Sequence, residues 1–398
     1  MAYYFVTRYF YPDESSGNTL LLSLTRKLAK NDNSINILTS NRVRDSQIKL
    51  SKNEAKYNMN IIRLGLPHSR NQNLAFRLFD YGLFLIKVFI FILFKLNKDD
   101  VLISMSDPPF LSVVSGMSCR LKKIKQTQWV QDVFPELASS TGLKIPLLNT
   151  LIFLRNWSMN LSYKIVVISD EMRDFFIHQG IDQKKIHLIP NWIDENEIYP
   201  VKKEGNNQYS KFIRGDKFVV GYSGNMGLKE DFESLLYSAK ELKDFSGIEF
   251  LFIGSGNRKN ELEDYVKLNN LKNVKIHPLQ KKEILNYTLN IPDIHAITLL
   301  EKVSPYSYPS KIYGVMATGK PLIFIGEKDC EMYKFIETNG IGISVENQDK
   351  EQLLRVIKEL YENKDLREEM SDKSRKLFLS KYTFEASFKK WSEVLYIR

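Results

Sequence analysis

The stretch Ser304–Gly326, which reads SPYSYPSKIYGVMATGKPLIFIG, predicts a loop, a short helix, a turn and a buried strand. Ser310 is a favoured N-cap residue, so we expect the helix to begin at Lys311. Gly319 suits the left-handed position that often follows a helix, and the proline just after it cannot continue one. The apolar run Leu322–Ile325 is typical of an interior strand. This succession of helix and buried strand indicates an α/β fold.

Lys311 is the unusual residue of this stretch. A cation in the first helical turn opposes the helix dipole, at a cost of about 0.3–1 kcal/mol when it is exposed. A bound anion reverses the sign, because backbone N–H groups and the ammonium then face the same negative charge. Ser310 and Lys311 therefore form a candidate phosphate site. The stretch alone is equally compatible with a solvated lysine on an ordinary connecting helix.

The composition indicates a globular protein with a basic surface. A chain of 398 residues exceeds one ordinary core and predicts two domains. The formal net charge of +10 points to an acidic partner, such as nucleic acid, anionic lipid or a phosphorylated substrate. The basic cluster Lys122–Lys125 lacks interleaved aromatic residues, which argues against a nucleic-acid platform. Two distant cysteines and five scattered histidines argue against a metal centre. The N-terminal residues lack signal-peptide order, so we expect a cytosolic protein.

One segment has a composition typical of membrane contact. Tyr81–Leu96, YGLFLIKVFIFILFKL, is apolar apart from Lys87 and Lys95. It is shorter than the roughly 20 apolar residues that a spanning helix needs. Two interpretations stay open. The segment is a helix buried in a large domain, or it dips into one leaflet with Arg77, Lys98 and its own lysines near lipid phosphates.

Strand-like and helix-like segments alternate along both halves of the chain. This alternation predicts parallel βαβ units with right-handed crossovers. Such sheets bind ligands at the carboxyl ends of their strands. The functional edge of the first half is therefore expected at three loops, Pro12–Thr19, Ser106–Phe110 and Asp132–Ser140.

The segment 201–217, VKKEGNNQYSKFIRGDK, breaks the alternation because it is polar, charged and poor in apolar residues. This composition is typical of an interdomain linker. We therefore place a first domain over residues 1–200 and a second over 201–383. Each domain opens with a strand, a glycine-containing loop and a helix.

The best phosphate-loop candidate is Val219–Leu236, VVGYSGNMGLKEDFESLL. Gly224 and Gly227 permit positive φ and close backbone approach. The following helix offers backbone N–H groups to an anion, and Lys229 adds charge. The alternative is that these glycines serve chain reversal alone.

Two further loops carry candidate residues. Asp132 follows a predicted strand and Glu136 lies just beyond it. A carboxylate in this position can take a proton from an attacking hydroxyl, although Asp is also a favoured N-cap. Gly17 lies between the first strand and its helix, where it either lets a substrate approach the backbone or serves as a plain connection.

Taken in order, these motifs resemble the retaining glycosyltransferases of family 4, and among them those of O-antigen, capsule and colanic-acid assembly. The motifs are YFYPDESSGNT, VLISMSDPPF, WVQDVFPELASSTG, KIVVISDEMRDFF, IHLIPNWID, VVGYSGNMG, FLFIGSG and YPSKIYGVMATGKPLIFIG. They cover essentially the whole chain. The resemblance implies the GT-B fold: two Rossmann-like, doubly wound parallel-sheet domains facing across a cleft. It also implies that a last helix, 384–398, crosses back to the first domain.

The resemblance implies roles for individual residues. The nucleotide-sugar donor would be held by the second domain through Ser223, Gly224, Asn225, Lys229, Ser310 and Lys311. Gly17 of the first domain would lie beneath the donor's phosphate or sugar. Asp132 would sit on the acceptor side of the cleft. From their position after a strand, Asp132 and Glu136 are the candidate catalytic carboxylates. No metal is implied, because lysine and helix dipoles replace it.

The chain departs from the family pattern in three places. Tyr306 and Gly314 stand where the wider family often carries two glutamates, so a ribose contact through the second glutamate is absent. Glu301 is a candidate substitute for the first glutamate, at a different spacing. Leu228 stands where an arginine is common, with Lys229 next to it.

We therefore expect a retaining, metal-independent hexosyl- or N-acetylhexosaminyltransferase without a cofactor. It would move a sugar from a nucleotide-sugar, UDP favoured over GDP, to a lipid-linked polyprenyl-diphosphate saccharide in bacterial surface polysaccharide assembly. Its expected location is the cytoplasm, peripherally on the inner membrane, with an anionic membrane surface as partner and no nucleic acid. The alternatives are a GT-B nucleotide-sugar epimerase and a non-enzymatic, basic membrane-binding scaffold.

Overall fold

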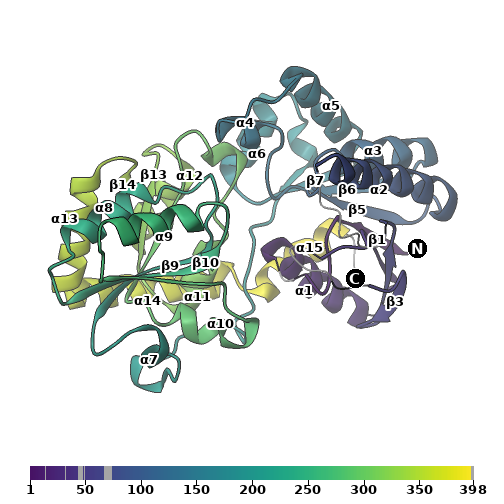
Figure 1. Ribbon diagram of the computed structural model, residues 1–398. Helices are drawn as coiled ribbons and strands as arrows, with labels where there is room; N and C mark the ends of the chain where they lie inside the picture. Colours follow the sequence, from purple (N-terminus) through teal and green to yellow (C-terminus); the bar gives the residue numbers. More distant parts are fainter. Residues whose placement is uncertain (14, 32, 44–47, 49, 67–73, 396–398) are drawn as a thin grey trace. The chain divides into compact units, whose positions relative to one another are not determined.

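The computed structural model describes residues 1–13, 15–31, 33–43, 48, 50–66 and 74–395 (Figure 1). The chain divides into two compact units. The first unit is Met1–Pro190 together with the chain end from Trp391, and the second is Asn191–Lys390. The expected boundaries at 200/201 and 383/384 therefore differ from the observed divisions. Residues 396–398 of the predicted last helix lie outside the described residues.

Among the described residues, the first unit contains an eight-stranded sheet in the order β3-β4-β2-β1-β5-β6-β7-β8. Its strands are β1 (Tyr3–Val6), β2 (Ile35–Thr39), β3 (Asn53–Lys56), β4 (Met59–Arg63), β5 (Val101–Met105), β6 (Lys125–Trp129), β7 (Lys164–Val167) and β8 (Ile186–Leu188). All neighbouring pairs are parallel except the β3–β4 hairpin. The strand order reverses between β1 and β5, which is where a doubly wound sheet binds ligands.

The helices of the first unit follow the predicted alternation. They are α1 (Ser16–Lys30), α2 (Leu74–Lys95), α3 (Leu111–Lys122), α4 (Glu136–Ser140), α5 (Leu148–Leu161) and α6 (Asp170–His178). Ser169 caps α6, because its hydroxyl accepts from the Met172 N–H at 3.1 Å. The short helix α4 lies in what the sequence predicts as a loop, since its motif is too short to show a period.

Helix α2 is apolar on two faces. Phe84, Val88 and Ile92 are buried at helical spacing against the sheet. Ile86 and Phe94 lie on the opposite side and are 57% and 77% exposed. Packing in the core therefore explains the apolar residues on one face of this helix and leaves those on the other face unexplained. No helix in the described part of the chain has the length and apolar character that crossing a membrane requires.

The second unit contains a six-stranded parallel sheet in the order β11-β10-β9-β12-β13-β14, counted over the described residues. Its strands are β9 (Phe218–Asn225), β10 (Ile248–Ser255), β11 (Val274–His277), β12 (Ile294–Thr298), β13 (Leu322–Gly326) and β14 (Gly342–Glu346). The order reverses between β9 and β12. The glycine loop after β9 and the segment that leads from β12 to Lys311 therefore meet at the switch point of the sheet.

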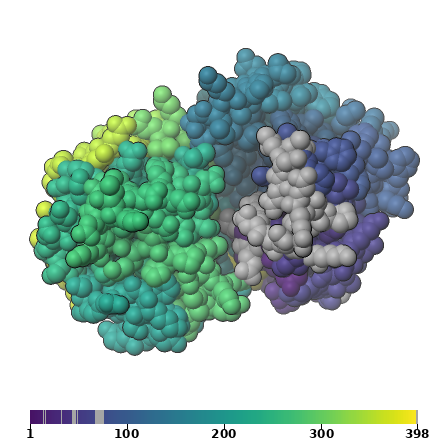
Figure 2. Space-filling model, viewed as in Figure 1, coloured from purple at the N-terminus to yellow at the C-terminus, as the bar shows by residue number. Residues whose placement is uncertain are grey.

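Helices cover both faces of the second sheet (Figure 1). The helices of this unit are α7 (Tyr209–Phe212), α8 (Glu233–Glu241), α9 (Lys259–Leu268), α10 (Lys282–Leu289), α11 (Lys311–Thr318), α12 (Glu331–Asn339), α13 (Lys350–Glu362) and α14 (Lys364–Lys381), and α15 (Phe384–Leu395) runs from it into the first unit. Figure 1 shows α8, α9 and α13 on one face and α10, α11 and α14 on the other. Figure 2 shows one side of this unit as a space-filling surface. The side turned to the viewer comes mainly from the green segment that holds α9 and α10.

The last helix returns to the first unit as expected. The units divide within α15, after Lys390. The Trp391 ring lies 4.8 Å from the ring of Trp129, centroid to centroid, and both side chains are fully buried. Lys164 Nζ donates to the Val394 carbonyl at 2.7 Å. The chain end thus completes the core of the first unit.

The prediction of a linker over 201–217 is wrong. Ile213 is buried and packs with Val219, Leu251 and Ile291 of the second unit. The Asn206 side chain is also buried and donates to the Tyr287 carbonyl at 2.8 Å. The segment is thus packed on the second unit through Ile213 and Asn206, although most of its polar side chains are exposed.

Candidate functional site

The carboxyl end of β9 carries the first part of the site. Gly224 has a φ of 134°, which side chains rarely adopt. A Cβ atom built on it would lie 2.6 Å from Lys311 Cε. The glycine thus lets the Lys311 side chain cross the end of the strand. The predicted close approach at Gly224 is present, and the approaching group is this lysine.

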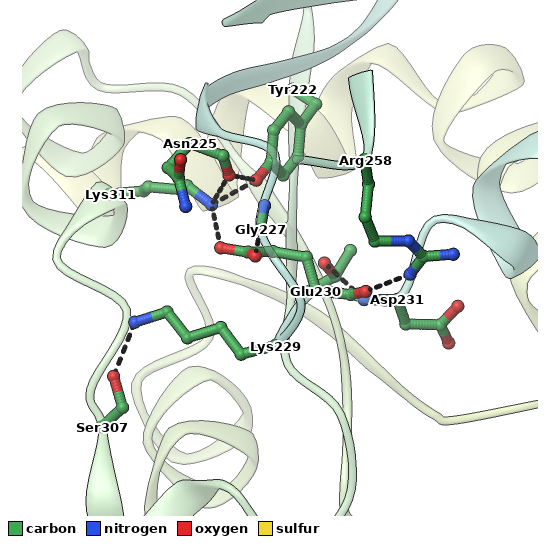
Figure 3. A network of polar contacts seen from close by, with 10 residues as sticks. Tyr222, Asn225, Gly227, Lys229, Glu230, Asp231, Arg258, Ser307 and Lys311 are labelled. Atoms are coloured by element: carbon green, nitrogen blue, oxygen red, sulfur yellow. Dashed lines mark hydrogen bonds and ion pairs between the residues drawn. The ribbon is translucent and has the colours of Figure 1, made fainter. Parts of the chain in front are cut away.

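Lys311 begins α11, as the sequence predicts, and its ammonium is the centre of a polar cluster (Figure 3). Nζ donates to Tyr222 OH, to Glu230 Oε1 at 3.1 Å and to the Asn225 carbonyl at 3.4 Å. The Lys311 side chain is 18% exposed. Burial lowers the pKa of Lys311 to about 8. The negative charge of Glu230 raises this pKa, and the positive charge of Lys229 lowers it further.

The predicted N-cap role of Ser310 is wrong. Ser310 already has helical angles, with φ −63° and ψ −14°, and its side chain forms no capping hydrogen bond. The Ile312 and Tyr313 N–H groups instead donate to the carbonyls of Pro309 and Ser310, each at 3.3 Å. A helix that tightens over its first turn satisfies these amides through its own backbone.

The N-terminus of α8 is not the open anion site that the sequence suggests. The Asp231 carboxylate accepts from the N–H groups of Glu233, at 3.1 Å, and Ser234, at 3.3 Å. It also accepts from the Ser234 hydroxyl at 2.9 Å. A carboxylate of the chain therefore caps the first turn of α8. This leaves the loop and the Lys311 ammonium as the anion-attracting groups at the switch point.

Glu230 holds the glycine loop and the lysine together. Its side chain is 2% exposed. Oε2 accepts from the Gly227 N–H at 2.9 Å, while Oε1 faces Lys311. Figure 3 shows this carboxylate between the loop and the ammonium.

The remaining donor-site candidates lie around this cluster. Lys229 Nζ donates to the buried Ser307 hydroxyl at 2.7 Å, which ties the loop after β9 to the segment before α11. Ser223 is half-buried and Asn225 is exposed at the end of β9. Glu301 is exposed in the turn after β12, and the carboxylate that reaches Lys311 is Glu230.

The first unit holds the other candidates at the carboxyl edge of its own sheet. Asp132 follows β6 and lines a cavity together with Ser106, Phe110 and Phe134. The Ser106 hydroxyl accepts from the N–H groups of Gln131, at 3.0 Å, and Asp132, at 3.4 Å. This bond connects the loops after β5 and β6. Asp132 thus lies beside a hollow at the carboxyl edge of the first sheet.

Glu136 has a different environment from Asp132. It lies in α4, is buried, and its Oε1 pairs with Arg155 Nη2 at 2.5 Å. The geometry therefore links Glu136 to a buried guanidinium that also lines the cavity. Gly17 lies in the first turn of α1, where an added Cβ would meet Met105 Cε at 3.8 Å. The catalytic and donor-binding roles of these residues stay predictions.

Sequence reasoning missed two members of the Lys311 cluster, Tyr222 and Glu230. Tyr222 resembles any apolar residue of a buried strand. Glu230 follows Gly227 by three positions, a spacing at which a carboxylate returns to a loop N–H. That spacing could have predicted the bond between Glu230 and Gly227, although it does not predict the contact with Lys311.

Two α/β units, each built on a doubly wound sheet, are the architecture of the GT-B glycosyltransferases. Residues 17–197 match the family model described as Glycosyltransferase Family 4, and residues 204–377 match that of Glycosyl transferases group 1. The chain belongs to the family 4 glycosyltransferases.

The relatives agree with this assignment. The chain is 30% identical over 280 residues to the probable glycosyltransferase WbjE of Pseudomonas aeruginosa, covering 67% of this chain and 68% of that one. It is 27% identical over 200 residues to the putative colanic acid biosynthesis glycosyl transferase WcaI of Escherichia coli K12, covering 49% and 48%. Anabaena HepE in complex with UDP shares the fold, with a TM-score of 0.73, 13% identity and 99% coverage of both chains.

Proposed function

We propose that this glycosyltransferase moves a hexosyl or N-acetylhexosaminyl group from a nucleotide-sugar to a lipid-linked saccharide in bacterial surface polysaccharide assembly. A UDP-sugar is favoured over a GDP-sugar, and the reaction retains configuration without a metal or cofactor. The observation that carries the proposal is the Lys311 ammonium, held at the switch point of the second sheet beside the Gly224 loop. The names of WbjE and WcaI support the surface-polysaccharide role, and the HepE complex supports UDP.

The second unit would stabilise the leaving group. When the bond between the sugar and the diphosphate breaks, negative charge grows on the diphosphate. A preorganised ammonium at that position lowers the barrier more than solvent does, because it needs no reorganisation. Lys311 supplies this charge, and Lys229 adds a second positive group to the same loop region.

The first unit would bind the acceptor at the edge that carries Asp132. A carboxylate there can take the proton of the acceptor hydroxyl as the new glycosidic bond forms. Glu136 would support this edge through its ion pair with Arg155. Retention itself is expected from the family resemblance.

An anionic membrane surface is the partner proposed for α2. Its outward face exposes Ile86, Ile90 and Phe94, with Lys95 and Lys98 exposed at the same end. Apolar side chains beside lysines suit the interface of an anionic bilayer. Such contact would keep the enzyme near a lipid-linked acceptor, at the cytoplasmic face of the inner membrane.

Titration calorimetry with UDP and GDP tests the donor site. We expect the wild-type protein to bind UDP more tightly than GDP, and Lys311→Met to weaken UDP binding about tenfold or more. Lys334→Met, which removes an exposed lysine of α12, is the matched control and should leave the affinity unchanged. A wild-type protein that binds neither nucleotide would overturn the proposal.

Incubation of the donor with and without a lipid-linked saccharide separates transferase from epimerase. A transferase consumes the donor when the acceptor is present, whereas an epimerase converts the donor sugar by itself. The scaffold alternative predicts vesicle binding without nucleotide affinity.

A further inference from the structure

The Lys311 ammonium already has an acceptor for each of its hydrogens. An ammonium has three donors. Tyr222 OH, the Asn225 carbonyl and Glu230 Oε1 lie within hydrogen-bond distance of Nζ. A phosphate that arrives at Lys311 must therefore replace one of these acceptors or share the ammonium with it.

Glu230 is the charged member of this group, and it is fixed from its other side. Its second oxygen accepts from the Gly227 N–H at 2.9 Å. A Cβ on Gly227 would lie 3.0 Å from that oxygen, so the glycine permits this bond. A buried carboxylate held in this way is a local negative charge at the point where the diphosphate is expected.

Two negative groups cannot share one ammonium without cost, because like charges in a poorly solvated site repel strongly. The diphosphate must therefore bind against the field of Glu230. The same repulsion favours departure of the nucleoside diphosphate after transfer, when its charge has increased.

We propose that Glu230 is a resident counter-ion of Lys311, which the diphosphate of the nucleotide displaces from the ammonium. Glu230 is thus a positioning residue that weakens diphosphate binding and speeds product release. The inference rests on the proposed donor site.

The decisive variant is Glu230→Gln. The amide oxygen still accepts from the Gly227 N–H, while the negative charge is removed. Glu263→Gln is the matched control, because it removes the same charge from an exposed ion pair. Glu263 pairs with Lys259 on α9. UDP and uridine are the probes, since uridine lacks the diphosphate.

Because loss of Glu230 lowers the pKa of Lys311 further, calorimetry is run over a range of pH. Where Lys311 keeps its proton, Glu230→Gln should bind UDP about tenfold more tightly than the wild type, with uridine binding unchanged. Stopped-flow displacement should show slower UDP release. Glu263→Gln should match the wild type in both measurements. Thermal unfolding checks that both variants fold.

The outcomes are distinguishable. If the wild type binds UDP and Glu230→Gln binds it equally or more weakly, the counter-ion role is overturned while the donor site stands. A gain that appears equally for uridine also overturns it, because the effect would not involve the diphosphate. If neither protein binds UDP or GDP, the proposed function fails and this inference fails with it.

Discussion

At the residue scale, the ion pair between Lys311 and Glu230 lies at the centre of the polar cluster of the second unit. The Glu230 side chain is buried and that of Lys311 is half-buried, and each is held by further bonds. A pair in this setting is weak evidence for stability, but loss of one partner leaves a buried charge without compensation. Removing one partner of the pair should therefore cost more stability than removing both.

Lys311→Met should lower the free energy of unfolding by about 3 kcal/mol, because the Glu230 carboxylate is then buried without its cation. The double variant Lys311→Met/Glu230→Gln should recover most of this loss. Urea denaturation of both proteins measures the difference. Equal stability of the single and double variants would contradict the coupling.

The affinity for UDP should fall above pH 8. The folded-state pKa of Lys311 is lowered to about 8 by burial, so the ammonium loses its proton within a range where an exposed lysine keeps it. The groups that face it are Glu230, Tyr222 and Lys229. Kd should be constant between about pH 7 and 8, where the terminal phosphate of UDP keeps its full charge, and rise about tenfold per pH unit above pH 8. In Lys311→Met this rise should disappear, and its persistence would assign the titration to another group.

Gly224→Ala should displace Lys311 and destabilise the loop. A side chain at a φ of 134° costs about 1–3 kcal/mol, and the new methyl would overlap Lys311 Cε. We expect weaker UDP binding together with a lower unfolding temperature. Gly215→Ala is the control for the cost of a side chain at positive φ without a steric overlap. Gly215 has a φ of 73°, and no atom lies within 4 Å of its added Cβ.

At the element scale, most strands and helices could be predicted because their apolar spacing is strong. The helix that begins at Lys311 and the strand over Leu322–Ile325 lie where the sequence predicts them. Helix α4 was missed, since five residues are too few to show a helical period. In the site, Lys311 and Gly224 were found through local backbone chemistry. Tyr222 and Glu230 were not, because they meet Lys311 only through the crossover that brings β9 beside β12.

The exposed face of α2 gives the element-scale prediction. Replacing Ile86, Ile90 and Phe94 together by serine should reduce binding to phosphatidylglycerol-containing vesicles at least fivefold, because their apolar area no longer enters the interface. Vesicle co-sedimentation measures this change. Leu268→Ser, on the exposed face of α9, is the control and should bind like the wild type. Equal binding of the triple variant would remove α2 as the contact.

At the scale of the whole molecule, the chain end is part of the first unit. Trp391→Ala should cost about 3–5 kcal/mol in the unfolding of that unit, because it removes a fully buried ring beside Trp129. UDP binding by the second unit should change little. Denaturation followed by tryptophan fluorescence, with UDP titration of the same variant, tests both statements. A parallel loss of UDP affinity would contradict a donor site that is held mainly by the second unit.

The position of Trp391 also has a consequence for synthesis on the ribosome. The first unit begins with β1, yet the ring that packs on Trp129 leaves the exit tunnel only after the entire second unit. The core of the first unit therefore stays incompletely packed while the second unit is translated. Nascent chains stalled before that tryptophan should be the species that chaperones bind and proteases cut.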